Sequence, residues 1–162
     1  MDSAFLDVDR HGVLRIPGLL WCAFALLARH WLLILALVVS ARREGSVVLL
    51  LGESGVPWLL LAMEAPIVVL AFAGFYRSPT ASAWARQAWR HGREIVALTA
   101  LFNIAWTTKL LSQSDYWTPW PELLLASCCL LDSAIATSMY KTPYFKQLFR
   151  EFPERPPKGQ TT

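Results

Sequence analysis

Residues 17–41 constrain the fold most, because they are almost entirely apolar and carry Arg29 and His30 at their middle. As a helix rising about 1.5 Å per residue, the stretch is about 37 Å long, whereas a hydrocarbon core is about 30 Å thick. A central arginine costs roughly 2.5–3.5 kcal/mol on insertion scales, and each Leu, Ile, Phe or Val returns about 0.3–0.6 kcal/mol. Twelve such residues outweigh that cost. We therefore expect one transmembrane helix with Arg29 turned toward other protein.

Three further apolar stretches follow, and each has a polar side chain near its middle. They are residues 57–75 with Glu64, residues 95–111 with Asn103 and residues 122–140 with Asp132. The chain is 55% hydrophobic and only 17% charged, where about 25% charged residues is usual for a soluble domain. We predict an all-α polytopic membrane protein, with four transmembrane helices in a bundle over residues 17–142.

The segment between the second and third crossings has the pattern of a basic interfacial helix. Residues 78–93 place Arg86, Arg90 and Arg93 on one face and small apolar residues on another. Such a face is typical of a helix that lies on an anionic lipid surface. Nucleic-acid binding is not expected, because the basic patch is small and tethered at both ends.

The two ends of the chain are expected to lie outside the bilayer. Residues 1–16 are polar and short, and residues 143–162 combine an amphipathic helix with a tail whose composition predicts disorder. Residues 47–51 are too short to cross, and the sequence leaves open whether they enter the membrane. No cleaved signal peptide is expected, because the first segment is acidic and the apolar stretch after it is too long.

Lys and Arg residues predict the orientation. They are concentrated in residues 1–16, in the loop between the second and third crossings, and after residue 140. Positive charge marks the cytoplasmic side of a multi-pass membrane protein. We predict that both termini are cytoplasmic and that the loops at 42–55 and 112–120 lie outside.

No motif in the sequence indicates catalysis, a cofactor or a metal. There is no glycine-rich phosphate loop, nucleophile elbow or HExxH motif. The cysteines Cys22, Cys128 and Cys129 lie in apolar stretches with no metal-binding spacing. An enzyme is the least favoured class.

The strongest candidate site is a polar cluster at the midplane of the bundle. Its members are Arg29, His30, Glu64, Asn103 and Asp132. Because these residues lie at one depth, we expect Arg29 to contact Glu64 or Asp132. One of the two acids should then hold a proton unless His30 is itself protonated. The cluster is either a substrate or proton site, or a salt-bridge network that fixes helix register.

Two blocks of sequence resemble a known family. The first is D-x-D-R-H-G-V-L-R-I-P, followed by A-R-H-W-L and S-A-R-R-E-G, and the second is the closing L-F-R-E-F-P-E. Both are similar to the YfeZ-like proteins, bacterial inner-membrane proteins grouped as a domain of unknown function (DUF2919). The resemblance implies a polytopic inner-membrane protein and supplies no activity or ligand.

These observations leave two functional hypotheses. The first is an accessory or scaffold subunit with a buried Arg–carboxylate network, which contacts the lipid bilayer and another membrane protein or a second copy of itself. The alternative is a small proton-coupled transporter or channel that uses a midplane carboxylate.

Overall fold

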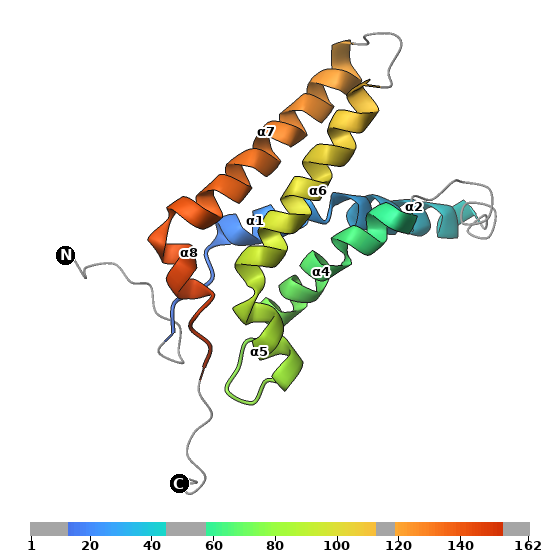
Figure 1. Cartoon of the computed structure of the whole chain (residues 1–162). Coiled ribbons are helices and arrows are strands. Elements are labelled where there is room, and N and C mark those ends of the chain that lie inside the picture. Colours follow the sequence, from blue (N-terminus) through green and yellow to red (C-terminus); the bar gives the residue numbers. More distant parts are fainter. Residues whose placement is uncertain (1–12, 45–57, 113–118, 154–162) are drawn as a thin grey trace, which may run out of the picture.

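The computed structural model describes residues 13–44, 58–112 and 119–153, and this part of the chain is all-helical (Figure 1). The helices are α1 (Gly18–Leu27), α2 (Arg29–Glu44), α4 (Trp58–Phe75), α5 (Ala83–Arg90), α6 (Gly92–Ser112), α7 (Pro119–Lys141) and α8 (Pro143–Leu148). The expectations for residues 1–12, for 47–51 and for the tail beyond 153 fall outside the described residues.

Three helices are long and apolar enough to cross a membrane. They comprise Trp58–Phe75, Gly92–Ser112 and Glu122–Lys141, and they coincide with the last three stretches expected from the sequence. Helix α6 begins three residues earlier than expected, which gives this crossing an ordinary length. Helices α6 and α7 form a long antiparallel pair, and α4 crosses α6 (Figure 1).

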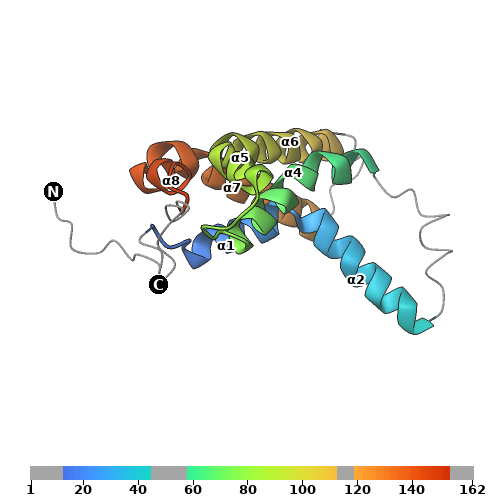
Figure 2. The same ribbon diagram turned by 90° about the horizontal axis from the view of Figure 1, so that it is seen from below.

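The first expected crossing is not one continuous helix, which corrects the prediction for residues 17–41. The chain bends by 72° between α1 and α2, and Ala28 at the bend has φ −96° and ψ 23°. Figure 2 shows α2 leading away from the other helices. The pair is therefore one broken span or a re-entrant segment.

The core lies where α1, α4 and α6 meet. It contains fully buried apolar side chains from all three helices, among them Leu27, Ile67, Leu70, Val96 and Ala100. The same region holds the buried polar side chains of Glu64 and Asn103. The apolar contacts thus surround the candidate site and fix the positions of its helices.

The same core continues to α5 and α8 at one end of the bundle. Trp89 is fully buried, donates its indole N–H to the Leu148 carbonyl at 3.0 Å, and lies with its ring 4.9 Å from that of Phe149. Helix α8, part of the amphipathic segment expected after residue 142, therefore packs its apolar side on protein.

The expected amphipathic helix over residues 78–93 is also shorter. Helix α5 ends at Arg90, and the chain turns before α6 starts at Gly92. A Cβ atom at Gly92 would collide with the ring of Phe149, so glycine permits α8 to pack directly on this turn. Because of the turn, Arg86 and Arg93 belong to different helices.

Candidate functional site at the helix break

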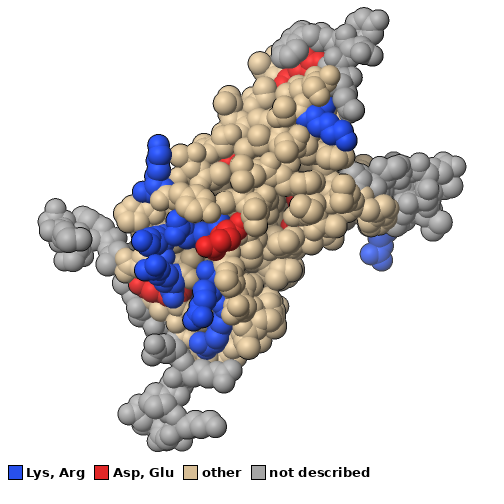
Figure 3. Space-filling view, in the orientation of Figure 1, with Lys and Arg blue, Asp and Glu red and all other residues tan. Residues whose placement is uncertain are grey.

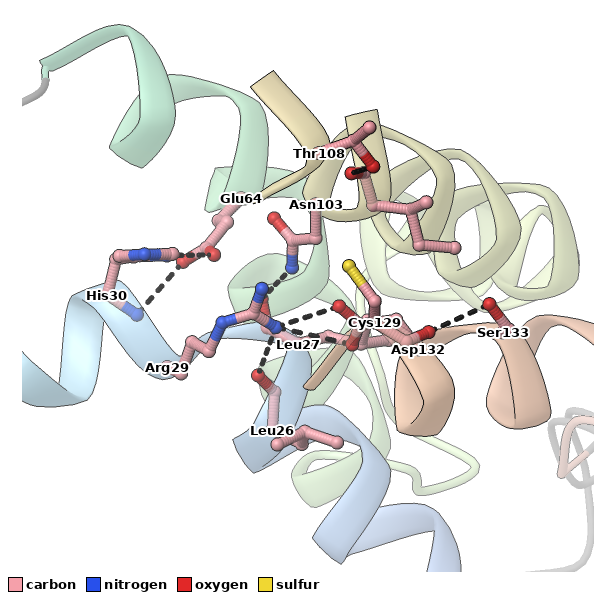
Figure 4. A network of polar contacts seen from close by, with 11 residues as sticks. Leu26, Leu27, Arg29, His30, Glu64, Asn103, Thr108, Cys129, Asp132 and Ser133 are labelled. Carbon is pink, nitrogen blue, oxygen red and sulfur yellow. Dashed lines mark hydrogen bonds and ion pairs between the residues drawn. The ribbon is translucent and has the colours of Figure 1, made fainter. Parts of the chain in front are cut away.

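Two ion pairs lie side by side at the bend between α1 and α2 (Figure 4). Arg29 Nη1 is 3.0 Å from Asp132 Oδ2 and 3.2 Å from Oδ1. His30 Nδ1 is 2.6 Å from Glu64 Oε1. Both acidic side chains are fully buried, whereas those of Arg29 and His30 are 17% and 25% exposed. Each acid therefore meets a basic partner that retains some access to the surroundings.

The same side chains replace the backbone hydrogen bonds that the bend interrupts. In a continuous helix the N–H of His30 would bond to the carbonyl of Leu26. Here the His30 N–H donates to Glu64 Oε2 at 3.3 Å, and the Leu26 carbonyl accepts a long bond of 3.4 Å from Arg29 Nη1.

Asn103 on α6 completes this replacement. Its Nδ2 donates to the Leu27 carbonyl at 3.2 Å, and the side chain is buried. Backbone groups cannot be left unsatisfied at membrane depth. The buried side chains of Glu64 and Asn103, together with the partly exposed Arg29, therefore bond to backbone groups that lose their helical partners at the break between α1 and α2.

Each acid of the cluster faces one basic side chain. Arg29 contacts Asp132, and His30 contacts Glu64. The predicted contact of Arg29 with one of the two acids is therefore made to Asp132, and the second acid has the imidazole of His30 as its partner.

One buried polar atom of the cluster has no partner among the described residues. Asn103 Oδ1 is buried and accepts no hydrogen bond from any described residue. Thr99 and Thr107, one turn to either side on α6, are also buried. The stripe of Thr99, Asn103 and Thr107 on α6 thus faces protein.

The structure brings together all five residues of the predicted midplane cluster. Arg29 selects Asp132, and Glu64 pairs instead with His30. Sequence reasoning missed Trp31, whose indole N–H donates to the Leu61 carbonyl on α4 at 3.0 Å. Tryptophan usually finds an acceptor for its indole N–H. The position of Trp31 next to Arg29 and His30 in the sequence was the signal that could have indicated this hydrogen bond.

The predicted basic face has a different organisation. Arg86 donates from Nη2 to the Pro79 carbonyl at 2.7 Å and lies 4.9 Å from the Phe152 ring centre. Arg93 donates from Nε to the Met139 carbonyl at 3.2 Å. Arg90 is exposed. The three arginines therefore do not share one helix face, although Lys and Arg side chains gather at this end of the molecule (Figure 3).

Arg77 is a second residue that sequence reasoning undervalued. Its Nη1 donates to the Leu14 carbonyl at 2.6 Å and its Nη2 to the Glu151 carbonyl at 2.7 Å. The Glu151 side chain in turn accepts the Leu14 N–H at 3.1 Å. Arg77 thus joins the segments before α1 and after α8 at the end of α4.

Metal ligation receives no support from the described residues, which contain no group of three His, Cys, Asp or Glu side chains able to hold an ion. No curated protein and no solved structure matches the chain significantly. A family model described as "Protein of unknown function (DUF2919)" matches residues 3–151. The chain therefore belongs to the DUF2919 family of proteins of unknown function.

Proposed function

We propose that this chain is a multi-pass protein of the bacterial inner membrane that acts as an accessory or scaffold subunit and not as an enzyme. The observation that carries the proposal is the internal pairing of the midplane cluster. Each of its two acids contacts a basic side chain of the same cluster, and its remaining hydrogen bonds join backbone groups at the break between α1 and α2. Such a cluster fixes the arrangement of four crossings, the first of them broken.

The distribution of charge supports a cytoplasmic location for both termini. Exposed or half-buried basic residues gather around α5, α8 and the adjoining helix ends, namely Arg77, Arg86, Arg90, Arg93, Lys141, Lys146 and Arg150. The described helices contribute Arg42, Arg43 and Lys109 at the opposite helix ends. The positive-inside rule then orients the basic end toward the cytoplasm.

The lateral surface of α7 supports the role of a subunit. Only 11% of its span is buried within the chain, and Leu124 and Leu130 are 65% and 73% exposed. In a membrane this surface contacts lipid, another membrane protein or a second copy of the chain. We place the protein partner here and propose no nucleic-acid partner.

Site-specific photocrosslinking in native membranes tests the role of a subunit. A photoreactive residue replaces Leu130 on α7, and a matched control replaces the buried Ala100 on α6. The proposal predicts adducts of discrete protein mass from position 130 and none from position 100. If position 130 yields lipid adducts alone, the chain is not a subunit through this surface.

A proton-coupled transporter is the second candidate, and one specific contact favours it. His30 is a quarter exposed and approaches the fully buried Glu64 to 2.6 Å, so it offers a proton a path to the carboxylate. Interrupted helices also form the ion sites of many transporters. A proton-flux measurement on the purified chain in liposomes that contain a pH-sensitive dye distinguishes the two candidate functions. Transport predicts a flux that Glu64→Gln abolishes and that Thr108→Ala, on an exposed face of α6, leaves intact.

A further inference from the structure

A pocket of about 350 Å³ lies at the basic end, between α5 and the segment that follows α8. Its charged lining consists of Arg86, Arg90 and Arg150, and its apolar lining includes Trp89 and Phe152. The volume is within the range of about 300–1,000 Å³ that is usual for small-molecule sites. No acidic side chain is among the described residues that line it.

The three arginines are held differently. Arg86 is half-buried and anchored to the Pro79 carbonyl and the Phe152 ring. Arg90 and Arg150 are exposed, and neither has an ion-pair partner among the residues that the structure describes.

The nearest acid in sequence to Arg150 is already engaged. The carboxylate of Glu151 accepts the Leu14 N–H and the Gln147 side-chain N–H. Three positive charges therefore converge on one pocket that has no counter-charge among its described lining residues, which is a favourable arrangement for a bound anion.

The pocket lies at the level where lipid headgroups are expected. Helix α4 ends at Phe75 and α6 begins at Gly92, with α5 between them. Large exposed aromatic side chains occur at this level, with Tyr76, Trp84 and Tyr140 each more than half exposed. Aromatic residues of this kind are enriched at the membrane–water interface.

We propose that this pocket binds the phosphate group of an anionic phospholipid from the surrounding leaflet. The guanidinium groups of Arg90 and Arg150 donate to the phosphate oxygens, and Arg86 supplies a fixed third charge from the pocket wall. The proposed site therefore contains Arg150 in place of Arg93 of the expected basic face. It is a defined pocket, whereas the sequence predicted a helix face lying flat on the lipid surface. The inference rests on the proposed membrane location and is independent of the scaffold role.

Native mass spectrometry of the full chain in detergent, titrated with phosphatidylglycerol, tests the proposal. We compare Arg90→Gln/Arg150→Gln with the control Lys141→Gln/Lys146→Gln, which removes the same charge from exposed positions that do not line the pocket. A hydrogen bond to a charged group contributes roughly tenfold or more to affinity. The arginine pair should therefore weaken binding by roughly 100-fold, whereas the lysine pair, which does not line the pocket, should leave it nearly unchanged. Arg90→Lys/Arg150→Lys should recover part of the loss and shows that the positions tolerate substitution.

Three outcomes would overturn the proposal. Equal weakening by the arginine and lysine pairs would indicate general charge attraction and no pocket. Equal retention of phosphatidylcholine and phosphatidylglycerol by the native chain would exclude selection of an anionic lipid. Displacement of phosphatidylglycerol by an equal concentration of inorganic phosphate would assign the pocket to a soluble anion. None of these results depends on whether position 130 crosslinks to a protein.

Discussion

Replacing Arg29 with Leu removes the cation that faces Asp132. The Asp132 carboxylate is fully buried and accepts hydrogen bonds from Arg29 Nη1 at both of its oxygens. Removing one partner of a buried ion pair costs roughly 3–5 kcal/mol of stability. Asp132→Leu should cost toward the lower end of that range, because the remaining Arg29 side chain is 17% exposed and retains some hydration.

The double substitution Arg29→Leu/Asp132→Leu should recover most of this loss. Two leucines bury no charge, so only the Leu26 carbonyl loses its long hydrogen bond from Arg29. An unsatisfied buried acceptor costs about 1–3 kcal/mol. Additive losses would sum to at least about 6 kcal/mol. We therefore predict a favourable coupling of at least about 3 kcal/mol between Arg29 and Asp132.

The assay is equilibrium unfolding in mixed micelles of a mild detergent and an increasing fraction of a denaturing one, followed by circular dichroism. Arg29→Leu/Glu64→Leu is the comparison, because Glu64 pairs with His30. Its coupling should be clearly smaller than that of Arg29 with Asp132. A larger coupling to Glu64, or none to Asp132, would refute the pairing described above.

Two further predictions concern single side chains. Gly92→Ala should lower the free energy of unfolding by about 1–3 kcal/mol, because the added Cβ collides with the buried ring of Phe149. Gly18→Ala is the control, since Gly18 has open space around it, and it should not show this loss in the same unfolding assay. Asn103→Leu should cost about 1–3 kcal/mol, since the Leu27 carbonyl loses its donor, and thermal unfolding in detergent would show an unchanged midpoint if that bond were unimportant.

Much of the fold could be predicted from the sequence because hydrophobic length is a strong signal. The expected stretches at 57–75, 95–111 and 122–140 correspond to α4, α6 and α7 within a few residues. The break at Ala28 could not be predicted in this way. No proline or glycine occurs at this position. The break is stabilised by polar side chains from α4 and α6, which bond to its backbone groups and are distant in sequence.

The residues of the candidate site could be predicted from the sequence, but which acid pairs with which basic side chain could not. Arg29, Glu64, Asn103 and Asp132 each lie near the middle of an apolar stretch, which places them at one depth. Packing of the helices into a bundle then brings side chains at the same depth close together. Which acid pairs with Arg29 depends on the direction of the chain after the bend, and this direction presents His30 to Glu64. The function of the cluster stays a prediction that flux and crosslinking measurements address.

The distance between spin labels at Leu19 and Ser40 tests the central claim, that buried polar side chains hold the first span in a broken conformation. Both positions are exposed, and the labels require a chain whose native cysteines are replaced by alanine. With a rise of about 1.5 Å per residue, a continuous helix separates the two backbone positions by about 32 Å. A bend of 72° at Ala28 shortens this separation to about 26 Å. The account predicts the shorter distance in lipid nanodiscs, and a single population at the longer distance would contradict it.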